Sequence, residues 1–195
     1  MTEDEFEFIK SKYQYWSSWA VWAEEGDTPK SNVGDLSVFD LKRNPKLLEI
    51  LNPNIVLVAL NISRGDITKP FANFHDSRPE ATDFKIRYAT KDTILWGAYM
   101  TDIIKDFEEK VSGKVQRFLK DNREFEKKNV EFFLNELSEV GAINPTLIAF
   151  GNDVFDILKR NLKEEFNIFK IPHYAAYTGK EKYREKVADL CRQIV

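Results

Sequence analysis

Four short apolar runs divide the chain, and polar residues follow each of them. The runs cover residues 55–60, 94–100, 146–150 and 166–171. The first, IVLVAL, is apolar at every position, which is typical of a strand buried on both faces of a parallel sheet. Segments with helical spacing separate the runs, so strands and helices alternate. We therefore predict an α/β fold, a three-layer α/β/α sandwich on a four-stranded parallel sheet, in a single domain covering residues 1–195.

The helical segments differ in character. Residues 3–25 carry aromatic side chains mostly three or four positions apart, with neither proline nor glycine among them. This spacing predicts an N-terminal helix with an aromatic face, which we interpret as core packing. Residues 103–140 are helical in pattern and densely charged, and a final helix of mixed charge is expected at about 180–194.

Composition narrows the class of protein. The chain has 29 Lys and Arg against 32 Asp and Glu, a net charge of −3, and 43% hydrophobic residues. These values exclude disorder as the default and a strongly basic nucleic-acid coat. A single cysteine, Cys191, excludes an internal disulfide and four-cysteine metal sites. Apolar runs are too short to cross a bilayer, and the N-terminus is acidic. We expect a soluble cytoplasmic protein without a metal, a cofactor or a membrane contact.

The candidate chemistry lies at the ends of the predicted strands. Asn61, Asp102, Asn152 and His173 each follow one apolar run. Ligands of parallel α/β sheets bind outside the carboxyl ends of the strands, so these residues are expected to share one crevice. A triad of His173 and Asp102 with Ser63 is disfavoured, because Ser63 lacks the Gly-x-Ser-x-Gly elbow. The sequence contains no Walker loop, dinucleotide fingerprint or metal-ligand motif.

Short motifs in a particular order resemble the uracil-DNA glycosylase superfamily. They are Leu-Asn-Ile-Ser at 60–63, Pro-Phe at 70–71, Ala-Tyr-Met-Thr-Asp-Ile-Ile-Lys at 98–105, Leu-Ile-Ala-Phe-Gly at 147–151 and Pro-His-Tyr at 172–174. The resemblance covers about residues 54–190. It implies the same three-layer fold and an enzyme that hydrolyses the N-glycosidic bond of a damaged, uracil-like base in DNA. Such enzymes flip the base out of the stack before they cleave it.

The resemblance also implies roles for individual residues. Asn61 would position the attacking water, and Phe71 would offer the ring on which the flipped base stacks. His173 would donate a hydrogen bond to the base oxygen that becomes negative as the bond breaks. Asp102 occupies the position at which the family has an amide that hydrogen-bonds to the edge of the base. Ser63 is a further base-binding candidate.

DNA contacts are expected beyond His173. Tyr174 and Tyr177 are candidates for the wedge that replaces the flipped base. Lys180 and Lys182 follow the same loop and are placed to meet a phosphate backbone. DNA is therefore the expected partner, although a solvated helix face explains these lysines equally simply.

The chain also departs from the family pattern, which leaves alternatives open. Ile62 replaces a proline, Tyr174-Ala175 replaces Pro-Ser, and Asp102 replaces the reading amide. The charged helical segment at about 106–137 has the character of an insertion. One alternative is a non-catalytic nucleic-acid or nucleotide-binding module that keeps the glycosylase fold. Another is an interaction protein using the aromatic N-terminal helix. Asp102 could also serve only as the N-cap of a helix starting at Ile103.

Overall fold

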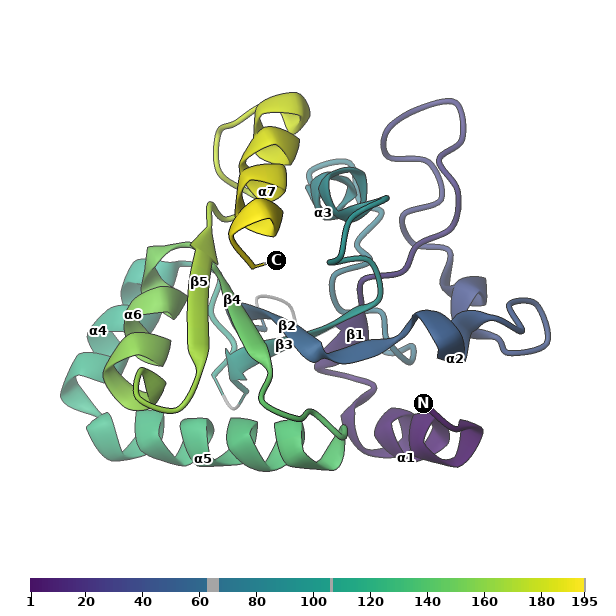
Figure 1. Cartoon of the computed structure of the whole chain (residues 1–195). Coiled ribbons are helices and arrows are strands. Elements are labelled where there is room, and N and C mark those ends of the chain that lie inside the picture. Colours follow the sequence, from purple (N-terminus) through teal and green to yellow (C-terminus); the bar gives the residue numbers. More distant parts are fainter. Residues whose placement is uncertain (63–66, 106, 195) are drawn as a thin grey trace.

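The computed structural model describes residues 1–62, 67–105 and 107–194. In this part of the chain, one sheet of five strands lies between two layers of helices (Figure 1). The strand order is β1-β3-β2-β4-β5. The parallel strands are β2 (Asn52–Asn61), β3 (Ala98–Ile104), β4 (Thr146–Phe150) and β5 (Asn167–Ile171), and β1 (Ser17–Trp19) pairs antiparallel with β3. The predicted α/β fold with a parallel core is confirmed, but the sheet has five strands rather than four.

Strand β2 shows why its sequence is apolar throughout. Its side chains alternate between two hydrophobic clusters, one on each face of the sheet. Val56, Val58 and Leu60 face one layer, and Ile55, Leu57 and Ala59 face the other. The first layer contains α1 (Glu3–Tyr13), α4 (Ser112–Asp121), α5 (Arg123–Glu139) and α6 (Asn152–Leu162). The second contains α3 (Phe84–Thr90) and α7 (Lys180–Ile194).

Shorter elements complete the described chain. A 3-10 helix, η1 (Leu36–Phe39), and the one-turn helix α2 (Leu47–Ile50) precede β2. No helix within the described ranges is both long enough and apolar enough to span a bilayer.

The predicted helix over residues 3–25 is wrong beyond Tyr13. Helix α1 starts with a capping box formed by Thr2 and Glu5 and ends at Tyr13. Trp19 then lies in β1, fully buried against Tyr99 with ring centroids 4.9 Å apart. Pairing with the edge of β3 outweighs the local helical pattern, because strand hydrogen bonds and burial of the indole are available only in the folded sheet. Trp22 is buried as well and Trp16 is half-buried, so the three tryptophans form no exposed interaction face.

The strand predicted at 94–100 is displaced by four residues. Strand β3 covers Ala98–Ile104, and Gly97 precedes it at φ +86°. A Cβ on Gly97 would lie 2.1 Å from the Ile50 carbonyl oxygen, so this close approach requires glycine. Asp102 therefore lies inside a strand and caps no helix. The sequence misplaced the strand end because Thr101 and Asp102 are polar yet buried.

Within the charged segment predicted at 106–137, residues 112–121 and 123–137 are helical, and much of this helical part belongs to the core. Helix α5 packs against β3, and its buried face includes Phe133, Glu136 and Leu137. Helix α4 buries Val115 and Leu119 in the same cluster. This segment forms a large part of one helical layer.

Candidate functional site

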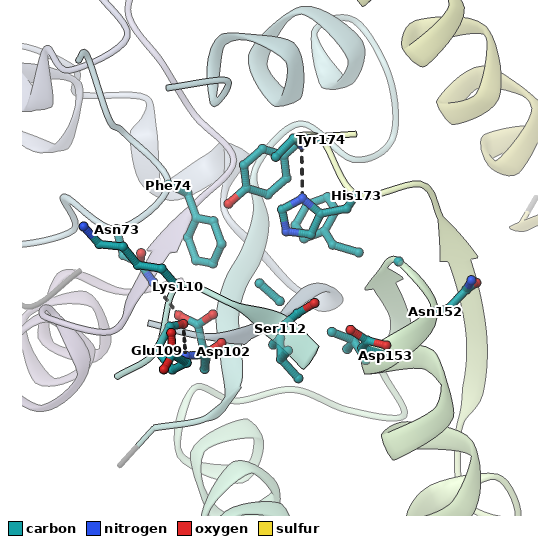
Figure 2. A pocket seen from close by; sticks show the side chains of 17 residues that line it. Asn73, Phe74, Asp102, Glu109, Lys110, Ser112, Asn152, Asp153, His173 and Tyr174 are labelled. Atoms are coloured by element: carbon teal, nitrogen blue, oxygen red, sulfur yellow. Dashed lines mark hydrogen bonds between the residues drawn. The ribbon is translucent and has the colours of Figure 1, made fainter. Parts of the chain in front are cut away.

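A cavity of about 510 Å³ opens at the carboxyl ends of the four parallel strands (Figure 2). Its lining includes the end of β2, Asp102 of β3, and the turn that joins β4 to α6. His173 and Tyr174 follow β5 and complete it. The structure thus brings together Asn61, Asp102, Asn152 and His173, the polar residues that the sequence placed after the apolar runs, although Asp102 lies within β3. Cavities of this size are typical of small-molecule sites.

The His173 imidazole is a neutral hydrogen-bond donor. The backbone N–H of Ala175 donates to its Nδ1 at 3.0 Å. Because Nδ1 accepts, the proton of the neutral ring lies on Nε2. Loss of solvent lowers the pKa of His173, an effect that Asp153 only partly opposes. The ring stacks on Tyr174 with centroids 4.4 Å apart, which keeps it at the edge of the cavity (Figure 2).

The Asp102 carboxyl is buried yet has few partners. Asn73 Nδ2 donates to Asp102 Oδ2 at 2.8 Å, and the same nitrogen donates to the Trp16 carbonyl. Burial raises the pKa of Asp102 to about 7, against the opposing effects of the Lys105 charge and the Asn73 hydrogen bond. The carboxyl therefore changes its charge near neutral pH. A group that titrates there can act as either a donor or an acceptor toward a ligand.

The side-chain amide of Asn61 is committed to the protein. Its Nδ2 donates to the carbonyls of Ile62, Phe107 and Glu109, at 3.1, 2.9 and 2.9 Å. These bonds hold the segment that carries Glu109, Lys110 and Ser112 against the cavity. Sequence reasoning did not anticipate this anchoring, because two of the three carbonyl partners lie more than 40 residues away. Only Oδ1 remains available for the expected contact with water.

The ring of Phe71 does not line the cavity, contrary to the prediction that a base stacks on it. It is fully buried in the core, with its ring 5.6 Å from that of Phe6 and 5.2 Å from that of Phe39. It therefore offers no face to a base. Phe74 lines the cavity instead, 6.5 Å from the ring of Phe150. Both residues have positive φ, 58° and 65°, and this irregular backbone decides which ring faces the cavity.

Of the four expected DNA-contact residues, one lines the cavity and three lie outside it. Tyr174 lines the cavity, whereas Tyr177 is fully exposed in the loop that follows. The Lys180 ammonium lies 3.9 Å from the centroid of the Tyr88 ring and 3.2 Å from Glu181. Lys182 is exposed at the start of α7. Ser63, the remaining candidate, lies outside the described residues.

The cavity combines aromatic walls, a neutral imidazole donor and an acid that titrates near neutrality. Among the residues that the structure describes, no cluster of three or more histidine, cysteine or acidic side chains could hold a metal ion. Comparison of the chain with protein-family models, curated proteins and solved structures finds no match, so its own residues are the guide to its chemistry.

Proposed function

We propose that the cavity binds a nucleobase and that the protein hydrolyses the N-glycosidic bond of a damaged base in DNA. The observation that carries this proposal is the neutral His173 side chain, whose Nε2–H has no acceptor among the described residues. When an N-glycosidic bond breaks, the departing base gains negative charge. A preorganised donor at a base oxygen stabilises that charge in the transition state.

The aromatic lining supports a flat ligand. Phe74, Phe150 and Tyr174 all contribute to the cavity, and the Phe150 and Tyr174 rings meet edge to face at 5.2 Å. Every nucleobase presents a π-face, and stacking on aromatic side chains contributes about 1–3 kcal/mol per base. Figure 2 shows Phe74 and Tyr174 on the same side of the cavity, with the Asp102 carboxyl on another side. A planar ring could stack on the former and hydrogen-bond to the latter.

The surroundings of the cavity are suited to DNA with an extruded base. Ala175 and Tyr174 line the cavity, and the exposed Tyr177 is two residues farther along the same loop. An exposed aromatic ring at this point could fill the gap that a flipped base leaves. Lys180 and Lys182 follow it and could meet phosphates.

A base-release assay tests the proposal. Oligonucleotides that contain uracil, hypoxanthine or xanthine are incubated with the wild type, His173→Ala and Lys163→Ala. We expect release by the wild type and a loss of about 10²–10³-fold in His173→Ala, by analogy with a deleted oxyanion donor. Thermal stability should change little, because His173 is only partly buried. Lys163, exposed just beyond the far end of α6, provides the control and should leave the rate unchanged.

The second candidate is a nucleotide- or nucleic-acid-binding module without catalysis. The commitment of the Asn61 amide nitrogen to three carbonyls favours it, because the group expected to hold the water is mainly structural. This candidate predicts binding of the same oligonucleotides without release of any base. Release at equal rates by the wild type and His173→Ala would contradict both the proposed mechanism and this alternative.

A further inference from the structure

The inner wall of the cavity presents mainly hydrogen-bond acceptors. Two of the three amides that line the cavity have their nitrogens turned to the protein: Asn61 Nδ2 to three carbonyls, and Asn73 Nδ2 to Trp16 and Asp102. Because these partners accept hydrogen bonds, the orientation of each amide is determined, and the oxygens remain for a ligand. The second Asp102 oxygen adds a third acceptor without a partner among the described residues.

Donors are located elsewhere on the lining. His173 Nε2–H lies across the cavity from Asp102, next to Tyr174 (Figure 2). Lys110 and Ser112 also line the cavity, but both are exposed and stand at its rim. Glu109 adds little acceptor capacity, since its carboxylate takes the Val111 N–H at 3.0 Å and pairs with Lys114 at 3.2 Å. Asn152, at an exposed position of the lining, accepts from Lys170 through Oδ1 and keeps its Nδ2 as a further donor. The wall around Asp102 therefore presents acceptors, and the donors, His173 Nε2–H among them, lie on the other side of the cavity.

We propose that the preferred base is of the guanine type, a substrate class that rests on the proposed function. Guanine carries a ring N–H and an amino group side by side, and both can donate to the Asp102 carboxylate. Its O6 and N7 acceptors lie toward the other edge of the base, where His173 can donate to one of them. Substrates in DNA would be guanines altered at positions that leave the donating edge intact.

Uracil fits the same wall poorly. Its single N–H lies between two carbonyl oxygens, so a carboxylate that accepts from the N–H also approaches a carbonyl. Asn61 Oδ1 and Asn73 Oδ1 would add further acceptors beside it. An acceptor facing an acceptor loses hydrogen bonds that both groups had made with water. The family that the chain resembles has an amide at the position of Asp102, where it contacts the edge of the base. An acid at this position thus makes the cavity complementary to a different base.

Equilibrium binding of nucleosides tests the inference. Guanosine, inosine and uridine are titrated calorimetrically into the full chain at pH 8, where the Asp102 carboxyl is mainly ionised. Guanosine and inosine differ only in the exocyclic amino group. A hydrogen bond to a charged acceptor predicts that guanosine binds about 10- to 100-fold more tightly than inosine, with uridine weaker still.

Two variants locate the effect. Asp102→Asn should reduce the guanosine-to-inosine ratio to near one, whereas Asp156→Asn makes the same chemical change at an exposed position on α6 and should keep the ratio. The comparison of ligands on the wild type remains decisive if Asp102→Asn fails to fold. A ratio that Asp102→Asn leaves unchanged would overturn the assignment.

The outcomes separate the inference from the proposed function. Uridine binding as tightly as guanosine would overturn the inference and leave base binding intact. Absence of binding by every nucleoside at millimolar concentration would also overturn it. The base-release assay, run also on an oligonucleotide whose altered guanine keeps the ring N–H and the amino group, then decides independently whether the proposed hydrolysis stands.

Discussion

Two carboxyl groups on opposite sides of strand β3 are equally buried and very differently partnered. Glu136 of α5 is 0% exposed and Asp102 is 2% exposed. Glu136 accepts from Tyr99 Oη and Thr101 Oγ1, both at 2.8 Å, and forms an ion pair with Lys105 at 2.8 Å. Asp102 accepts from Asn73 alone among the described side chains. Glu136 thus joins a helix to the sheet, whereas Asp102 faces a cavity and keeps an oxygen that can accept a hydrogen bond from a ligand.

The surroundings of Glu136 show how a buried carboxylate is held: Oε1 accepts from two hydroxyl groups, and Oε2 pairs with Lys105. Lys105 Nζ also donates to Thr101 Oγ1 at 2.9 Å and to the Asp102 carbonyl, so the network continues along the strand. Asn129 Oδ1 accepts the Lys105 backbone N–H at 2.8 Å and adds a second link between α5 and β3. A buried charge is tolerated when it is paired and hydrogen-bonded in this way. Asp102 lacks such pairing, and its pKa rises instead.

The largest effect is expected from breaking the Glu136 network. Lys105→Met should lower the free energy of unfolding by about 3–5 kcal/mol, because it leaves a buried carboxylate without its countercharge. The double variant Lys105→Met/Glu136→Gln should recover much of this loss, since the oxygen of the introduced amide can still accept from Tyr99 and Thr101. Urea unfolding at pH 7 measures both. A double variant that is no more stable than the single one would show that the charge itself is not the cause.

An effect of comparable size is expected when Asp102 titrates. Its folded pKa, about 7, lies above the ordinary value of 3.8, so the folded protein retains a proton that the unfolded chain has lost. Stability should therefore fall as the pH rises from about 4 to about 7, by about 4 kcal/mol in all. Unfolding of the wild type and of Asp102→Asn is compared from pH 4 to pH 8, and other groups cancel in the difference. Parallel curves would show that Asp102 is ionised throughout.

The smallest effect concerns Asn61, whose nitrogen resembles Glu136 in being fully engaged. Asn61→Asp and Asn61→Ala should each lower stability by about 1–3 kcal/mol, because both remove the donor to three carbonyls. Both should also slow base release, since the segment with Glu109 loses its anchor. Thermal unfolding and the release assay are run on each. If Asn61→Asp kept wild-type stability and rate, the side-chain oxygen, acting on water, would be the important atom.

Prediction from the sequence succeeded where the local pattern of apolar and polar residues was enough to identify an element. The run from Ile55 to Leu60 identified the central strand, and the polar residues after the runs identified the end of the sheet where the cavity opens. Prediction failed where two residues of the same type were candidates for one position, as with Phe71 and Phe74 at the cavity wall. Both are aromatic and close in sequence, and only the backbone conformation around them determines which ring reaches the cavity.

The sequence by itself determined the α/β class and the gathering of Asn61, Asp102 and His173, because apolar runs and the polar positions after them are local properties of the chain. Tertiary structure alone decided that residues 17–19 form an edge strand and that Asp102 lies within β3. It also decided which buried acid is paired, because Glu136 is 31 residues or more from its partners Tyr99, Thr101 and Lys105. Hydrogen bonding and desolvation depend on such contacts, and no local pattern encodes them.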